Sequence, residues 1–192
     1  MNKKNHIIFF LTLMLCFTGN SLAYDFELGL YELNRGEFKA AIKEFTPLAA
    51  AGYSPAQYQL AMMYKNGQGL IADNKKALEL LTLAAQQKDS DAQFELSVIY
   101  SKGELVKQDL KKSFELTKQA AEKKMASAQF NLGVMHEQGL GVHRDDRQAA
   151  HWYLKAAEQN YALAQFNLAL MYYEGKGLEK NLKQSYIWNT LA

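Results

Sequence analysis

The sequence predicts an all-α fold, a superhelical solenoid of stacked helix-turn-helix repeats. A period of 36 residues runs without insertion or deletion through units 54–89, 90–125, 126–161 and the incomplete unit 162–192. Small or apolar residues recur four apart in both halves of each unit, which is the spacing of one helix face. A glycine-containing stretch separates the halves. Such a fixed period is typical of solenoids, in which each repeat buries its apolar side against its neighbours.

Residues 1–23 precede the repeats and are predicted to be a secretory signal peptide. The segment begins with two lysines, is continuously apolar over 7–17, and ends in Ser-Leu-Ala at 21–23, where small residues determine cleavage. The apolar run is shorter than the roughly 20 residues of a helix that spans a bilayer. We therefore expect cleavage and a mature chain that starts near Tyr24. A retained membrane anchor is the alternative.

The expected mature chain has little net charge and no cysteine. Removal of residues 1–23 takes away two lysines and no acidic residue, so 20 basic residues remain beside 20 acidic ones. This balance argues against nucleic-acid binding. Cys16, the single cysteine, lies in the signal segment, so a mature disulfide or thiolate metal site is not expected. Leu15 before it is larger than the small residue of a lipoprotein signal. Export without disulfides favours a periplasmic or secreted protein of a bacterium.

Residues 24–53 are predicted to be a shortened first unit of one repeat domain that covers 24–192. Gly29 aligns with Ala61 of the next unit once four residues are removed from the turn. The second helix of this first unit contains Pro47, which lacks a backbone donor and clashes with the preceding turn. We therefore expect that helix to end or kink near Thr46.

Each whole unit is predicted to contain two amphipathic helices that flank a glycine turn. Ala56, Leu60 and Tyr64 lie four residues apart and mark one face of the first helix in unit 54–89. Glycine reaches positive φ without a steric penalty, so Gly-x-Gly pairs are expected to end the first helices and reverse the chain. These pairs are Gly67 and Gly69, Gly139 and Gly141, and Gly175 and Gly177.

The second helices are expected to begin after a capping side chain. Short oxygen-bearing side chains stand at the required position in four units and satisfy free backbone N–H groups there. They are Asp73, Asp109, Asp145 and Asn181. Ser54, followed by Pro55, is expected to cap the first helix of its unit. Leu105 replaces the second glycine of unit 90–125, so we expect the least regular turn there.

The last unit stops inside its second helix. Ala192 is equivalent to Ala84, and no polar capping helix follows it in this sequence. Solenoid ends normally carry a polar cap for solubility. Either the apolar side chains of this helix pack against another molecule, including a second copy, or the natural chain continues. The side chains concerned are Tyr186, Ile187, Trp188 and Leu191.

Three segments within 128–159 carry a family resemblance: Ala-Gln-Phe-Asn-Leu-Gly, Gly-Leu-Gly-Val and His-Trp-Tyr-Leu-Lys-Ala-Ala-Glu-Gln. They resemble the Sel-one-like repeat (SLR), a relative of the tetratricopeptide repeat, and the resemblance covers nearly the whole chain after residue 50. It implies a right-handed α/α superhelix whose first helices line the concave face. His136 departs from the pattern because the sister units have tyrosine there.

No catalytic or metal-binding constellation is predicted. The sequence contains no His-Glu-x-x-His, serine elbow, phosphate loop or motif-fixed carboxylate pair. The mature histidines are His136, His143 and His151. A zinc site would need them to converge within about 2.0–2.1 Å of one ion, without an acidic or thiolate motif to support it. We interpret His136 as a packed aromatic substitute and expect no catalytic residue, cofactor or metal.

The inner face is the candidate binding surface. The resemblance places the residues two before and two after each buried leucine on this face. They form an aromatic row of Tyr58, Phe94, Phe130 and Phe166 and an aliphatic row of Met62, Val98, Val134 and Leu170. The two rows together, the inner rows below, could hold an extended or helical peptide by apolar contact. Alternatively, the aromatic side chains fill the core between repeats.

The repeat, the signal segment and the missing catalytic motifs predict a non-catalytic exported adaptor that binds a protein or peptide in the cell envelope. Neither nucleic-acid binding nor a membrane span after signal cleavage is expected. One alternative is a regulator of a cell-wall enzyme or an envelope signalling protein. Another is a β-lactam-binding or β-lactam-hydrolysing enzyme, by analogy with cysteine-rich members of the family that the chain resembles. Those members carry a disulfide in each repeat, and the mature chain has no cysteine.

Overall fold

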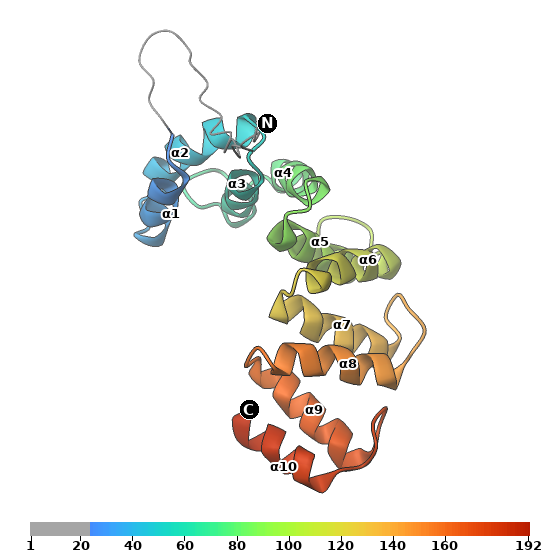
Figure 1. Ribbon diagram of the computed structural model, residues 1–192. Helices are drawn as coiled ribbons and strands as arrows, with labels where there is room; N and C mark the ends of the chain where they lie inside the picture. Colours follow the sequence, from blue (N-terminus) through green and yellow to red (C-terminus); the bar gives the residue numbers. More distant parts are fainter. Residues whose placement is uncertain (1–23) are drawn as a thin grey trace, which may run out of the picture.

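The computed structural model describes residues 24–192, which form ten α-helices and no strand in that range (Figure 1). The predicted signal peptide lies outside the described residues. The predicted all-α solenoid is confirmed. The helices are α1 (Phe26–Asn34), α2 (Phe38–Ala50), α3 (Ser54–Asn66), α4 (Asn74–Gln86), α5 (Ser90–Lys102), α6 (Leu110–Glu122), α7 (Ala126–Gln138), α8 (Asp146–Ala157), α9 (Ala162–Glu174) and α10 (Leu182–Leu191).

The helices stack in chain order, and each packs against the one before and the one after it. The stack forms an elongated arc, with α3 and α5 toward its inner side and α4 and α6 toward its outer side (Figure 1). In every unit the odd-numbered helix is the first helix and the even-numbered helix is the second. The inner side of the arc is called the inner face below.

Helix ends follow the predicted local chemistry, with one exception. The carboxylates of Asp73 and Asp109 each accept a backbone N–H at 3.0 Å, from Lys76 and Lys112, and Asp145 and Asn181 cap their helices in the same way. The glycine that ends each first helix has φ between 66° and 76°. The expected Ser54 cap is wrong. Tyr53 is the N-cap, because Ser54 is already the first helical residue and Pro55 the second.

The second glycine of each pair is required by packing between units. A Cβ atom on Gly141 would lie 2.0 Å from the carbonyl oxygen of Leu110, at the start of α6 in the preceding unit. Gly177 meets Asp146 in the same way, at 2.1 Å. Leu105 occupies this position in unit 90–125, where φ is not positive, and its side chain packs against a hydrophobic cluster. That turn therefore differs from the others.

The sequence predicted that α2 ends or kinks near Thr46. The helix continues through Pro47 to Ala50, so an end near Thr46 is wrong. Phe45 on one side of the proline is fully buried, and Ala49 on the other side is 5% exposed. Because both side chains belong to one core cluster with α3, their burial outweighs the loss of one backbone hydrogen bond.

Side chains of complementary size face each other inside each unit. A small residue on the first helix opposes a larger one on the second, and both are buried except in the last unit, where Asn189 is exposed. Gly29 opposes Phe45 and Gly133 opposes Tyr153, since a Cβ on either glycine would come within 2.4 to 2.6 Å of the opposing ring. The same two positions hold Ala61 and Leu81, Ser97 and Thr117, and Ala169 and Asn189 in the remaining units. This size matching shapes the candidate site.

Buried glutamines connect successive units. The glutamine near the start of each whole first helix is at most 4% exposed, and its amide donates to a carbonyl of the preceding second helix at 3.1 to 3.4 Å. The four pairs are Gln57 with Ala49, Gln93 with Ala85, Gln129 with Ala121, and Gln165 with Ala157. Each of these carbonyls lies at a helix end and also accepts the backbone N–H of the residue three positions later, so the glutamine amide uses its second acceptor site.

Candidate functional site

The predicted inner rows lie on the four first helices α3, α5, α7 and α9. The six residues on α3, α5 and α7 are half-buried, whereas Phe166 and Leu170 on α9 are 49% and 45% exposed. The difference arises because the following unit covers part of each row on α3, α5 and α7, and α10 alone follows α9. The rows therefore remain partly accessible along the whole length of the described repeats.

The aromatic row contributes to packing as well as to the inner surface. The ring centre of Phe130 lies 5.7 Å from that of Tyr153 and 5.2 Å from that of Tyr161, which leads into α9. Tyr58 and Phe94 likewise pack against core clusters that include the next unit. Each of these three rings thus has one part in the core between units and another part accessible from outside.

An ion pair closes the first junction between whole units, between α3, α4 and α5. Lys65, near the end of α3, pairs with Glu95 of α5, and their side chains are only 25% and 17% exposed. Burial, followed by the nearby carboxylates of Asp91 and Glu95, raises the pKa of Tyr58 to about 12. The phenol beside this junction therefore stays protonated and neutral at physiological pH.

The third junction, between α7, α8 and α9, is closed by Glu137. Its carboxylate accepts a hydrogen bond from the Tyr153 hydroxyl at 2.7 Å and one from the Lys176 ammonium at 2.6 Å. Burial opposes ionisation of Glu137, but hydrogen bonds from Lys176 and Tyr153 outweigh it, so its pKa lies below the usual value. Burial and the bond to Glu137 raise the pKa of Tyr153 above its usual range. Sequence analysis missed this cluster, because the spacing alone did not show that α7, α8 and the turn after α9 meet.

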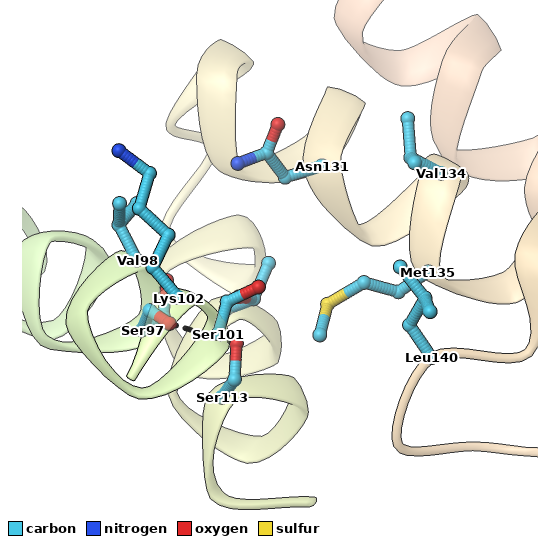
Figure 2. A pocket seen from close by; sticks show the side chains of 10 residues that line it. Ser97, Val98, Ser101, Lys102, Ser113, Asn131, Val134, Met135 and Leu140 are labelled. Atoms are coloured by element: carbon cyan, nitrogen blue, oxygen red, sulfur yellow. Dashed lines mark hydrogen bonds between the residues drawn. The ribbon is translucent and has the colours of Figure 1, made fainter. Parts of the chain in front are cut away.

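The second junction, between α5, α6 and α7, contains a cavity of about 220 Å³ (Figure 2). At its rim, Ser101 and Asn131 take the positions that carry Lys65 and Glu95 at the first junction. Their short neutral side chains form no ion pair. The cavity is lined by Ser97, Val98, Ser101, Lys102, Ser113, Thr117, Asn131, Val134, Met135 and Leu140. Two of the predicted inner-row residues, Val98 and Val134, therefore line the cavity.

The floor of this cavity is polar and almost completely buried. Ser97, Ser113 and Thr117 are each at most 2% exposed. The Ser97 hydroxyl donates to the carbonyl of Phe94 at 2.6 Å, and the Ser113 hydroxyl donates to the carbonyl of Ser97 at 2.8 Å. Both hydroxyl oxygens retain acceptor capacity. The Met135 side chain extends from α7 toward these serines and supplies an apolar wall (Figure 2).

Two further cavities, of about 360 and 430 Å³, lie between successive second helices. Gln93 and Leu116 line the first, and the equivalent Gln129 and Trp152 line the second. The two cavities are thus related by one repeat period. They arise from the stacking of equivalent surfaces.

The histidines do not assemble into a site. His136 packs edge-on against Phe114, with ring centres 5.4 Å apart, and burial lowers its pKa. His151 lies beside Trp152 on α8. Within residues 24–192, no three His, Cys, Asp or Glu side chains are close enough together to hold a metal ion.

None of the ten described helices has both the length and the apolar character needed to cross a bilayer.

Comparison with solved structures identifies similar repeat proteins. A protective antigen of uropathogenic Escherichia coli with an SLR fold is 31% identical, with a TM-score of 0.81 over 86% of this chain and 36% of the antigen. A Sel1 repeat protein from Oxalobacter formigenes is 28% identical, with a TM-score of 0.80 over 87% of this chain and 68% of that protein. The chain thus spans about a third of the length of the E. coli antigen.

A more distant structure, a putative Sel1 repeat protein from Klebsiella pneumoniae, is 21% identical with a TM-score of 0.57 and shares the fold. No curated protein matches the chain. The family model of the Sel1 repeat matches residues 54–89, 90–125, 126–161 and 162–192 in succession. These four matches cover most of the sequence, and the chain therefore belongs to the Sel1 repeat family.

Proposed function

We propose that the protein is a non-catalytic exported adaptor, which binds a protein or peptide segment of the bacterial cell envelope along the inner face of its solenoid. The observation that carries this proposal is the pair of inner rows, which remain accessible on α3, α5, α7 and α9. Sel1 repeat proteins generally mediate protein–protein interaction. The predicted signal peptide and the description of one relative as a protective antigen support the envelope setting.

The inner face suits a segment of polypeptide better than a compact small molecule. Apolar side chains recur once per unit along successive helices, so a long partner segment can contact several units at once. Polar side chains accompany them, with Asn131 and Asn167 half-buried beside the rows. Amides of this kind can pair with the backbone of a bound peptide, while the apolar rows contribute most of the binding energy.

Site-directed cross-linking in living cells tests the proposal. A photoreactive amino acid at Met62, in the aliphatic row on α3, should yield a discrete cross-linked product with an envelope protein. The matched control places the same group at Glu115, an exposed residue of the outer helix α6. Product at Met62 and not at Glu115 supports binding along the inner face. Equal labelling at the two positions, or none at Met62, contradicts it.

The identity of the cross-linked protein then decides between two versions of the role. A structural or transport component of the envelope supports a scaffold. A cell-wall enzyme or a signalling receptor supports the regulator considered above, and its activity should change when the adaptor is removed. Both versions use the same surface of this protein, so the Met62 experiment serves both.

A further inference from the structure

We propose that the cavity between α5, α6 and α7 receives a tyrosine side chain of the bound partner. This inference rests on the proposed adaptor function and specifies how the inner face would select its partner. The next unit fills the corresponding space with a tyrosine of its own, Tyr153, which is fully buried.

The two junctions correspond residue by residue. One period of 36 residues relates the cavity lining at the second junction to the surroundings of Tyr153 at the third. The equivalent pairs are Thr117 and Tyr153, Ser97 and Gly133, Ser101 and Glu137, Asn131 and Asn167, and Met135 and Met171. The large aromatic side chain is thus replaced by a small one at Thr117, and the space between α5 and α7 opens to the inner face.

The surroundings of Tyr153 show what chemistry this space accepts. Its ring packs on the backbone of α7 at Gly133, beside Phe130, and its hydroxyl donates to Glu137. Equivalent residues are present at the second junction, and of these Ser101 lines the cavity. Phe94 corresponds to Phe130, and Ser101 stands where Glu137 accepts the phenol. An apolar wall with a hydrogen-bonding end matches an aromatic ring that carries one hydroxyl group.

A tyrosine ring of the partner, bound in this cavity, would lie closer to the inner face than the Tyr153 ring does at the third junction. A Cβ on Gly133 would come 2.6 Å from the Tyr153 ring, and Ser97 has both a Cβ and a hydroxyl at that position. A ring held at the shallower depth must enter from the inner face, between Val98 and Val134. This is the direction from which a partner bound along the inner rows would present its side chains. The junction is suited to a side chain supplied by the partner, because none in the described chain fills the space.

The first junction strengthens the contrast. Leu81 occupies the position of Thr117, and the Lys65–Glu95 ion pair covers the gap between α3 and α5. At the third junction Tyr153 fills the space, and Glu137 with Lys176 covers it. Among the three junctions between successive units from residue 54 onward, only the second lacks both the filling side chain and the ionic cover.

The test uses p-cresol, the tyrosine side chain without its backbone, and the protein purified as it is exported. We expect saturable chemical-shift changes in NMR spectra, centred on Ser101, Asn131 and Val134. Toluene, which lacks the hydroxyl, should bind more weakly. The matched variant, called the filled variant below, is Ser97→Gly with Thr117→Tyr. It copies the Gly133 and Tyr153 pair and should bind p-cresol at least tenfold more weakly. A second variant, Ser97→Ala with Thr117→Leu, copies the Ala61 and Leu81 pair should the first not fold.

The outcomes separate the two proposals. Absence of localised saturable shifts in the wild type, or equal p-cresol binding in the wild type and in the folded filled variant, overturns the tyrosine site. A filled variant that cross-links its partner at Met62 as strongly as the wild type also overturns the tyrosine site and leaves the adaptor function standing. Absence of Met62 cross-linking in the wild type overturns the adaptor function and, with it, the assigned occupant. Loss of both p-cresol binding and partner cross-linking in the filled variant, with its unfolding midpoint unchanged, supports the site.

Discussion

The ring of Tyr153 lies directly against the backbone of α7 at Gly133, where an added Cβ atom would be 2.6 Å from the ring carbon Cδ1. Tyr153 is fully buried in this position and reaches Glu137 with its hydroxyl. The Tyr153 ring therefore leaves no space for a side chain larger than hydrogen at position 133. The same relationship links Gly29 to Phe45.

Substitution Gly133→Ala should destabilise the protein by about 1–3 kcal/mol, because the extra methyl group forces the buried ring or α7 to move. Urea unfolding followed by circular dichroism measures this. The double variant Gly133→Ala with Tyr153→Leu copies the Ala61 and Leu81 pair and should lose less stability than the sum of the two single changes. A Gly133→Ala protein as stable as the wild type would show that the contact is not tight.

Substitution Glu137→Gln should change how stability depends on pH. The folded-state pKa of Glu137 is below its usual value, so its ionised form stabilises the fold above the unfolded-state pKa. That contribution is lost as pH falls through the lowered pKa. The wild type should therefore lose more stability between neutral and acidic pH than the variant does. Urea unfolding at a series of pH values gives the two curves. Asp146 also has a lowered pKa, chiefly from its bond to Arg144, and that bond is present in both proteins.

Substitution Gln165→Leu should cost about 0.5–1.5 kcal/mol of stability, since the carbonyl of Ala157 loses its side-chain donor but keeps the backbone N–H of Asn160. Gln148→Leu is the control, because Gln148 is an exposed residue in the first turn of α8. It should change stability by no more than about 0.5 kcal/mol. Thermal unfolding of the two variants provides the comparison. Equal losses in both would argue that the buried amide has no special role in joining the units.

Expression in a bacterium with an active secretion pathway should yield a mature protein that begins near Tyr24. The physical reason is the short apolar segment at 7–17, followed by small residues at 21–23. Intact-mass measurement of the periplasmic or secreted protein checks the cleavage point. A purified protein that retains residues 1–23 and fractionates with membranes would instead support the alternative of a retained anchor.

The repeat architecture was predictable because it depends on local chemistry that recurs. Asp109 caps α6 through a backbone N–H three residues away, so the cap does not depend on the neighbours of the helix. Gly139 ends α7 by adopting a positive φ. The helix end expected at Pro47 and the cap expected at Ser54 were wrong for different reasons. Burial of Phe45 and Ala49 carried α2 past its proline, and α3 began one residue earlier than expected, so the Ser54 side chain lost its capping position.

The candidate surface was only partly predictable. The 36-residue spacing placed the inner rows on equivalent helix positions, but the sequence left open how much of each ring the next unit covers. In the structure, Phe130 packs against Tyr161 and is half-buried, whereas Phe166 is 49% exposed. Coverage of this kind depends on which helix follows in space.

The sequence by itself determined that the protein is a stack of Sel1 repeats with defined helix ends, because helix periodicity, capping and positive φ act within a few residues of one another. Only the tertiary structure decided which junctions are closed. The opposition of Ser97 to Thr117, and of Gly133 to Tyr153, arises when separate helices meet, and the cavity at the second junction is the volume left by the smaller pair. That volume depends on three helices at once, so no single stretch of the chain predicts it.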